Sequence, residues 1–246
     1  MKLLQSLWTV PMTSLCFVVS VFAVNELASK EELCMGKEYA DAFANPKDDP
    51  NLPNVLLIGD SISNAYTVEV RKQLHGKANV FRIPSNGKDS AYGLQKLNGW
   101  IGTRDWEVIH FNWGLWDLCY RNPKAKTQGH RDKVNGTQSV PPEQYKDNIE
   151  QIVARLKKTE AVLIWCTTTP VPEGEVGRKL GDDLKYNRIA AAIMKANGVQ
   201  INDLHAHALL KYAEIQKQKG DVHYSKEGST YLAEKVAQEI SSVLLK

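Results

Sequence analysis

A serine, a histidine and an aspartate in this chain have the surroundings that nucleophilic catalysis requires. Ser61 lies in the turn "GDSIS", directly after an apolar stretch, where a serine either caps the following helix or acts as a nucleophile. His223 lies in the short segment "DVHYS", and Asp221 precedes it by two residues. A histidine takes the proton of a serine nucleophile, while a carboxylate fixes the tautomer of that histidine and stabilises its charged form. The three residues are therefore candidates for an acyl-transfer triad, although on their own Ser61 also fits a helix cap and His223 a solvent-exposed loop histidine.

Five short apolar segments predict the strands that must position these residues. These segments are 54–59, 79–83, 107–112, 161–167 and 199–203. Three other segments repeat apolar side chains at helical spacing, namely 142–157, 184–196 and 226–244. Strands that alternate with helices predict a parallel sheet that is covered on both faces, with the site formed by loops at the carboxyl ends of the strands. Because Ser61 follows the first strand, we expect it at this carboxyl edge.

A long polar segment interrupts this alternation. Residues 118–141 have no hydrophobic period and are rich in polar and turn-forming residues. Long segments of this kind are often functional loops beside a site. We therefore expect residues 118–141 to form a flexible flap next to the carboxyl edge.

From about Val55 to its C-terminus, the chain resembles the SGNH (GDSL-type) hydrolases. Four segments carry the resemblance, namely "GDSIS", "IPSNGKDS", "FNWGLWDL" and "DVHYSKEG". Together with "TTTPVP", they make the chain look most like secreted bacterial esterase-like members. The resemblance implies an α/β fold, a three-layer α/β/α sandwich around a five-stranded parallel sheet of the flavodoxin-like type.

The resemblance also implies roles for individual residues. Ser61 would be the nucleophile and His223 its base, with Asp221 as the third member, although the family usually places one more residue between the aspartate and the histidine. The N–H groups of Ser61 and Gly87 would form the oxyanion hole. Trp116 stands where the family usually has an asparagine that donates to the oxyanion, so its indole N–H is the expected substitute. Such a mechanism needs neither a metal nor an organic cofactor.

Polar and aromatic residues of the third segment are candidates for substrate binding. We expect Asn112, Trp113 and Asp117 to contact the substrate, and Tyr120 to lie near them. Trp116 has a second interpretation, as a wall of a sugar-binding cleft. The expected activity is a secreted serine esterase that removes O-acetyl groups from carbohydrate. Two alternatives remain open, a lipase-like or thioesterase-like acyl hydrolase, and a carbohydrate-binding accessory protein with weak or no turnover.

The N-terminus predicts export. Residues 1–23 have Lys2, an uncharged and mostly apolar stretch, and small or modest residues before a cut after Ala23, as in a signal peptide. Residues 24–50 form a polar lead-in, and residues 51–246 form the hydrolase domain. The N-terminal segment therefore predicts that the protein is secreted or periplasmic. An uncleaved anchoring helix is the rival interpretation, and it would make the membrane a partner.

The overall charge argues against nucleic acid as a partner. The 246 residues are 43% hydrophobic and 24% charged, with a formal net charge of +3, and loss of residues 1–23 removes one lysine and no acid. The net charge is close to balance, and the sequence shows no basic stripe of the kind that binds nucleic acid. The expected partner is therefore a small-molecule or polysaccharide ester.

Cysteines and histidines outside the triad give weaker signals. Of the cysteines after residue 23, Cys34 and Cys119 are the more plausible disulfide pair, whereas Cys166 lies in an apolar run and is expected to be a buried thiol. His205 and His207 suggest a metal pair, but no third ligand lies nearby in the sequence, so we expect no metal site.

Overall fold

A parallel sheet of five strands forms the centre of the protein, whose computed structural model describes residues 34–244. The strands are β1 (Asn54–Ile58), β2 (Asn79–Arg82), β3 (Val108–Phe111), β6 (Val162–Cys166) and β7 (Gln200–Asn202). They lie in the order β2-β1-β3-β6-β7, and all neighbours are parallel. In β1 the last four residues are buried, as expected for a strand covered on both faces. The predicted fold class and all five predicted strands are confirmed, with ends that differ by one residue at most.

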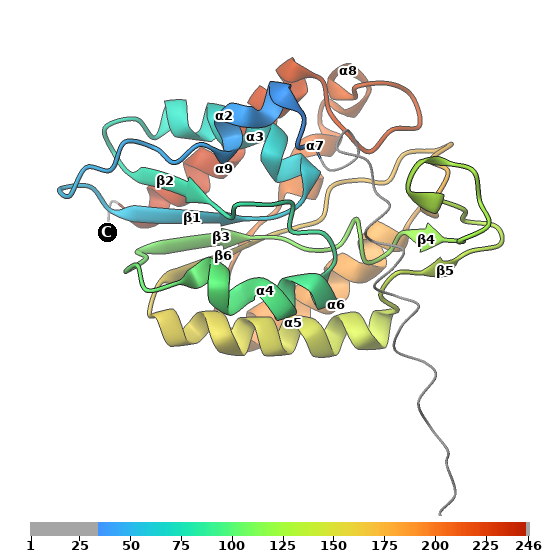
Figure 1. Ribbon diagram of the computed structural model, residues 1–246, viewed down its shortest axis with the longest axis horizontal. Coiled ribbons are helices and arrows are strands. Elements are labelled where there is room, and N and C mark those ends of the chain that lie inside the picture. The colour runs from blue at the N-terminus through green and yellow to red at the C-terminus, as the bar shows by residue number, and fades with distance from the viewer. Residues whose placement is uncertain (1–33, 245–246) are drawn as a thin grey trace, which may run out of the picture.

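Helices cover both faces of this sheet (Figure 1). One face carries α2 (Ala40–Phe43), α3 (Ser61–Gln73) and α9 (Lys226–Leu244), and the other carries α4 (Ser90–Ile101), α5 (Pro142–Leu156) and α6 (Asp182–Asn197). Three shorter elements follow the sheet or the helices, namely α7 (Leu204–Leu209), α8 (Tyr212–Ile215) and the 3-10 turn η3 (Lys157–Thr159). The architecture is therefore the three-layer sandwich that the sequence predicted.

Local sequence explains where the principal helices begin and end. Helix α5 starts with Pro142, whose missing N–H costs nothing in the first turn, and it buries the stripe that the sequence predicted. Helix α6 stops at Gly198, which adopts the left-handed conformation with φ 67°. Asp89 caps α4 by accepting a hydrogen bond from the Tyr92 N–H. The three predicted helices agree with α5, α6 and α9 within about two residues.

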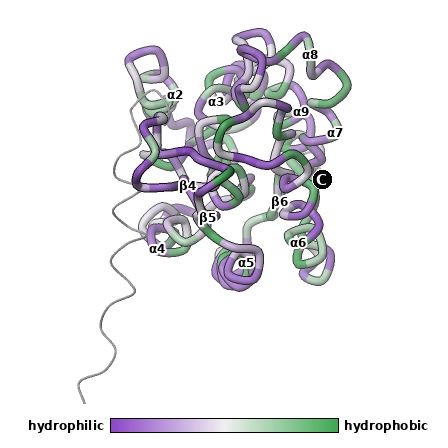
Figure 2. Tube along the Cα trace, turned by 90° about the vertical axis from the view of Figure 1, so that its right-hand side faces the viewer, coloured by the Kyte–Doolittle hydropathy of each residue, from purple (hydrophilic) through white to green (hydrophobic). Residues whose placement is uncertain are grey.

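Residues 118–141 form a structured hairpin lobe instead of an irregular flap. They contain β4 (Tyr120–Arg121), the 3-10 turn η2 (Gln128–His130) and β5 (Thr137–Gln138), and β4 pairs with β5 in antiparallel orientation. Figure 2 shows this lobe as largely hydrophilic chain beside the sandwich. The expectation of a segment without regular structure was wrong, and buried ionic contacts, described below, tie the lobe to the sandwich. Its flexibility stays a prediction.

The expected signal peptide, residues 1–23, and the first part of the polar lead-in, residues 24–33, lie outside the described residues. The described end of the lead-in contains the 3-10 turn η1 (Lys37–Tyr39) and α2, which packs on α3. None of the helices within residues 34–244 is both long and apolar enough to span a bilayer.

Candidate active site

Ser61 is the first residue of α3, and its hydroxyl is not used as the helix cap. The cap is Asp60, whose carboxylate accepts a hydrogen bond from the Ile62 N–H at 3.0 Å. A serine at the N-cap would accept this bond through its own oxygen, but Ser61 stands one residue later, at the first helical position. Because Asp60 performs this task, Ser61 Oγ is left for another partner, and that partner is His223.

His223 links Ser61 to Asp221 in a continuous hydrogen-bonded row. Ser61 Oγ lies 3.0 Å from His223 Nε2, and His223 Nδ1 lies 2.7 Å from Asp221 Oδ1. Asp221 Oδ1 also accepts a hydrogen bond from the His223 backbone N–H at 3.0 Å. The shorter spacing between the acid and the histidine therefore works because a tight turn folds the carboxylate back onto both nitrogens. The structure brings the three predicted residues together.

The ionic state of this row follows from these contacts. Burial alone would lower the pKa of His223, but the hydrogen bond to Asp221 and the neighbouring Cys34 side chain raise that pKa to about 9. For Asp221, burial acts to raise the pKa, but the hydrogen bonds and charge of His223 lower it to about 2. Each partner therefore stabilises the charged form of the other, as a histidine that must become an imidazolium requires.

Cys34 is a neighbour of the triad that the sequence did not suggest. It is buried, its backbone has φ 47°, and its carbonyl accepts a hydrogen bond from Asn64 Nδ2 at 3.1 Å. Asn64 stands one turn after Ser61 on α3, so this bond holds residue 34 beside the active site. The expected Cys34–Cys119 disulfide was wrong, because the described cysteines are free and Cys119 lies beside Gly177, in another loop.

The oxyanion-hole prediction for Gly87 was wrong in this structure. The Gly87 N–H donates to the Gly59 carbonyl at 2.9 Å, so it is already engaged. A Cβ at position 87 would stand 2.7 Å from the same carbonyl oxygen, which explains why a glycine is needed there. Gly87 therefore allows two backbone segments to approach each other closely at the turn that carries Ser61. The N–H of Ser61 lies in the first turn of α3, where helical N–H groups lack an intrahelical acceptor, and its role as an oxyanion donor stays a prediction.

The aromatic residues expected at the substrate are buried. Trp113 is 1% exposed, donates from Nε1 to the Gly87 carbonyl and lies against Gly93 of α4. Trp116 is 2% exposed, and the guanidinium of Arg121 lies 4.6 Å from its ring centre. Neither ring offers a face for stacking on a sugar, so both expectations of a sugar-binding surface were wrong. Donation by Trp116 to an oxyanion stays a prediction.

The two polar candidates of the third segment have structural partners. Asp117 is fully buried, and its Oδ1 accepts from the Ser90 N–H at 2.8 Å; burial raises its pKa well above the usual range. Asn112 Nδ2 donates to the Cys166 carbonyl at 2.6 Å and to Thr168 Oγ1 at 3.3 Å. The predicted substrate contact of Asp117 was wrong, because this buried carboxylate joins the chain after β3 to α4. Asn112 joins the end of β3 to β6 but is only half-buried, and its contact with substrate stays a prediction.

A buried ionic cluster ties the hairpin lobe to the third segment. Glu175 is 1% exposed and lies 2.9 Å from Arg178 Nη1 and 3.2 Å from Arg131 Nη1. Arg178 also donates from Nε to the Leu115 carbonyl at 2.7 Å. The cluster therefore connects the loop after β6, the hairpin and the chain before Trp116. Sequence reasoning missed Glu175 and Arg178, because nothing in their spacing distinguishes them from surface charges.

The other histidines serve the core or the surface. His110 is fully buried and pairs through Nε2 with Asn202 Nδ2, as a core residue. His205 lies 2.7 Å from Asp183, whereas His207 stacks on the ring of Tyr231. Within residues 34–244, no group of three or more His, Cys, Asp or Glu side chains is arranged to hold a metal ion.

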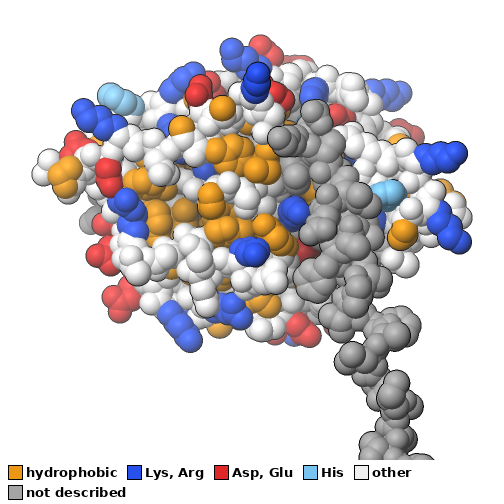
Figure 3. Space-filling view, in the orientation of Figure 1, with side chains coloured by type: hydrophobic (Ala, Val, Ile, Leu, Met, Phe, Trp, Pro, Cys, Tyr) orange, Lys and Arg blue, Asp and Glu red, His pale blue; other side chains and the backbone are white. Residues whose placement is uncertain are grey.

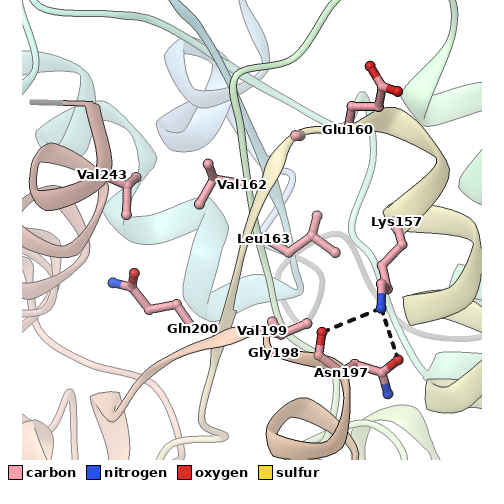
Figure 4. Close-up of a pocket in the computed structure, with 10 residues that line it drawn as sticks. Lys157, Glu160, Val162, Leu163, Asn197, Gly198, Val199, Gln200 and Val243 are labelled. Carbon is pink, nitrogen blue, oxygen red and sulfur yellow. Dashed lines mark hydrogen bonds between the residues drawn. The ribbon is translucent and has the colours of Figure 1, made fainter. Parts of the chain in front are cut away.

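A depression of about 480 Å³ lies away from this site (Figure 4). It is lined by Val162 at the start of β6, by Gln200 at the start of β7 and by Val243 near the end of α9. Lys157 closes one side by donating to Asn197. Since the lining comes from the amino ends of the strands, this depression is separate from the triad at the carboxyl ends.

Solved structures share this architecture at low sequence identity. Axe2, an acetylxylan esterase from Geobacillus stearothermophilus, aligns with a TM-score of 0.60 and 19% identity over 76% of this chain and 94% of its own. The lipase/acylhydrolase from Enterococcus faecalis has a TM-score of 0.62 and 15% identity over 77% and 96%. A GDSL-like lipase from Bacteroides thetaiotaomicron has a TM-score of 0.61 and 15% identity over 84% and 97%.

The sequence matches no protein-family model and no curated protein. The structural similarity covers most of this chain and nearly all of each neighbour. With its five-stranded sheet in the order β2-β1-β3-β6-β7, the chain has the SGNH (GDSL-type) hydrolase fold.

Proposed function

We propose that this protein is a serine esterase that uses Ser61, His223 and Asp221. The observation that carries the proposal is the unbroken row from Ser61 Oγ through the imidazole to Asp221, with distances of 3.0 Å and 2.7 Å. These distances allow direct proton transfer between a nucleophile and its base. A binding protein that had lost turnover would have no need to keep this row, so the geometry argues against the accessory-protein alternative.

The reaction follows from the positions of the donors and acceptors. Neutral His223 takes the proton of Ser61, and Ser61 Oγ attacks the ester carbonyl carbon. The carbonyl oxygen becomes an oxyanion, which the Ser61 N–H at the start of α3 would stabilise. Imidazolium His223 then returns its proton to the departing alcohol, which leaves an acyl-enzyme. Water, activated by the same histidine, attacks this acyl group and releases the acid and free Ser61.

Acetyl is the acyl group that we favour, with a carbohydrate as the alcohol. Ser61 is only 4% exposed, so the nucleophile lies in a confined position that favours a small acyl group. Among the structural neighbours, Axe2 is an acetylxylan esterase. Export of the protein, which its N-terminal sequence predicts, would suit an extracellular polymer as substrate. Hydrolysis of longer acyl chains is the second candidate, since two other neighbours are lipases or acylhydrolases.

Activity measurements with a hydroxyl-deleted variant test the proposal. Ser61→Ala should lower kcat on 4-nitrophenyl acetate to the uncatalysed background, a loss of roughly 10³-fold or more. Ser63→Ala is a matched control, because its hydroxyl belongs to the same helical turn but bonds to the Asp60 carbonyl and Arg82. Equal rates for wild type and Ser61→Ala would contradict the esterase proposal. Faster cleavage of octanoate than acetate esters would contradict the acetyl preference.

A further inference from the structure

The hairpin lobe, which follows the carboxyl end of β3, concentrates positive charge. Residues 118–141 contain five Lys or Arg and one acid, which gives this segment +4, although the whole chain of 246 residues carries only +3. Figure 3 shows Lys and Arg side chains at the end of the molecule where Figure 1 places β4 and β5. The rest of the chain is thus close to neutral, and the charge is local.

Two of the five cations have partners inside the protein. Arg121 is buried, donates to the Gly129 carbonyl and lies over Trp116, while Arg131 contacts Glu175. Of the three lysines, Lys124 and Lys126 are exposed and Lys133 is half-buried. Lys179, in the adjoining loop, is exposed as well, and its Nζ lies 4.3 Å from the ring centre of Tyr120.

The acids of this region offset part of the lysine charge. Asp132 accepts hydrogen bonds from the N–H groups of Val134 and Asn135 in its own turn, and these bonds help lower its pKa to about 2. Glu175 is buried between two arginines. Glu173 is exposed in the adjoining loop, and the half-buried Asp182 of α6 accepts a hydrogen bond from Gln138 Nε2 of β5. Within residues 118–141, Lys124, Lys126 and Lys133 outnumber Asp132, so the outward charge of the hairpin lobe is positive.

A second group of lysines lies on the other side of the triad. Lys217 and Lys219 are exposed in the loop before His223, and the Lys217 N–H donates to the His223 carbonyl at 3.0 Å. This loop touches the loop after β6, since a Cβ at Gly220 would stand 3.4 Å from the Gly174 backbone. The two lysine groups therefore lie on segments whose loops touch each other, and the second of these loops leads directly into the base of the triad.

We propose that this cationic surface, made by Lys124, Lys126, Lys179, Lys217 and Lys219, binds an anionic polysaccharide that carries the ester. A chain of uronic-acid type would cross from the hairpin lobe to the loop before His223 and present an O-acyl group to Ser61. Exposed ion pairs are individually weak, but several along one polymer add up and steer its encounter with the protein. The ester step rests on the proposed function, whereas binding of the polyanion does not.

Binding is measured with Ser61→Ala, which keeps the surface and removes turnover. Polygalacturonate is the anionic probe and dextran is the neutral one, and affinity is followed by titration calorimetry in 50 mM and 500 mM NaCl. The test variant adds Lys124→Gln, Lys126→Gln and Lys179→Gln. Its control adds Lys77→Gln, Lys158→Gln and Lys195→Gln, three exposed lysines outside the cationic surface that remove the same charge. Circular dichroism confirms that all the variants are folded.

Polygalacturonate should bind at low salt, dextran should not, and 500 mM NaCl should weaken binding because it shortens the screening length. The test variant should lose roughly tenfold in affinity, and the control variant should lose less than twofold. Equal losses in both variants, or no preference for the anionic polymer, would overturn the inference. So would stronger binding to vesicles containing phosphatidylglycerol, which would assign the surface to a membrane. A protein that binds polygalacturonate but hydrolyses no ester would refute only the proposed function.

Discussion

At the scale of single residues, the site depends on how a few polar atoms are shared. Asp60 caps α3 in place of Ser61, and Asp221 accepts two hydrogen bonds from His223. The sequence predicted all three members of the triad, because their types and order along the chain carry the signal. It could not predict that the Gly87 N–H is engaged or that Cys34 lies beside His223, since both depend on contacts between distant segments.

The pH dependence of catalysis should report the raised pKa of His223. The histidine must be neutral to act as a base, so kcat/KM in the free enzyme should rise with pH until about pH 9, beyond the usual value of 6.5. Asp221→Asn removes the main cause of this shift, so the apparent pKa should fall towards 6.5 and kcat should drop by roughly 10³–10⁴-fold. A pH–rate profile of both proteins checks this. A wild-type midpoint at or below 6.5 would contradict it.

Cys34 should contribute to the same titration. Because its side chain helps to raise the pKa of His223, Cys34→Ala should shift the kcat/KM midpoint to lower pH than in wild type. Cys119→Ala is the control, since this buried thiol lies in another loop, beside Gly177. Coincident pH–rate profiles for wild type and Cys34→Ala would show that Cys34 has no influence on the base.

At the scale of elements, buried charges fix a lobe that has little apolar core of its own. The strands and the long helices could be predicted because their apolar periodicity is strong. The hairpin of residues 118–141 could not, because short strands with polar side chains give no period. Glu175 accounts for its order, since one carboxylate holds Arg131 from the hairpin and Arg178 from the loop after β6.

Loss of this carboxylate should therefore destabilise the protein. Glu175→Gln leaves Arg178 buried without its negative partner, so the free energy of unfolding should fall by about 3 kcal/mol. Glu150→Gln is the matched control, because the Lys146–Glu150 pair is exposed to solvent and its loss should change the free energy of unfolding far less. Urea unfolding curves of the two variants make the comparison. An equal loss of unfolding free energy in Glu175→Gln and Glu150→Gln would mean that the buried cluster does not stabilise the protein.

At the scale of the whole molecule, the fold combines an apolar sheet with a few buried polar groups in its core. His110 of β3 is one of them, and burial lowers its pKa to about 4. In the unfolded chain a histidine titrates near 6.5. Between these values the unfolded state binds a proton that the folded state does not, so this residue makes stability fall as the pH drops from 6.5 to 4.

Replacement of His110 should reveal this contribution. The free energy of unfolding of wild type should decrease between pH 6.5 and 4, with roughly 3 kcal/mol of the decrease due to His110. His110→Gln keeps an acceptor for Asn202 but cannot titrate, so its decrease should be smaller. Urea unfolding at several pH values measures both slopes, with His75→Gln as a control for replacing an exposed histidine. Parallel slopes for wild type and His110→Gln would contradict the prediction.

The central claim, that Ser61 is the nucleophile of a serine esterase, is tested most directly by covalent labelling. A fluorophosphonate reacts only with a serine that a neighbouring base activates, and the adduct is located by mass spectrometry of the digested protein. We predict one label per chain, on Ser61, and no label in Ser61→Ala. Wild-type protein treated at low pH, where His223 is protonated, should not be labelled either. An unlabelled wild-type protein, or a label on another serine, would contradict the claim.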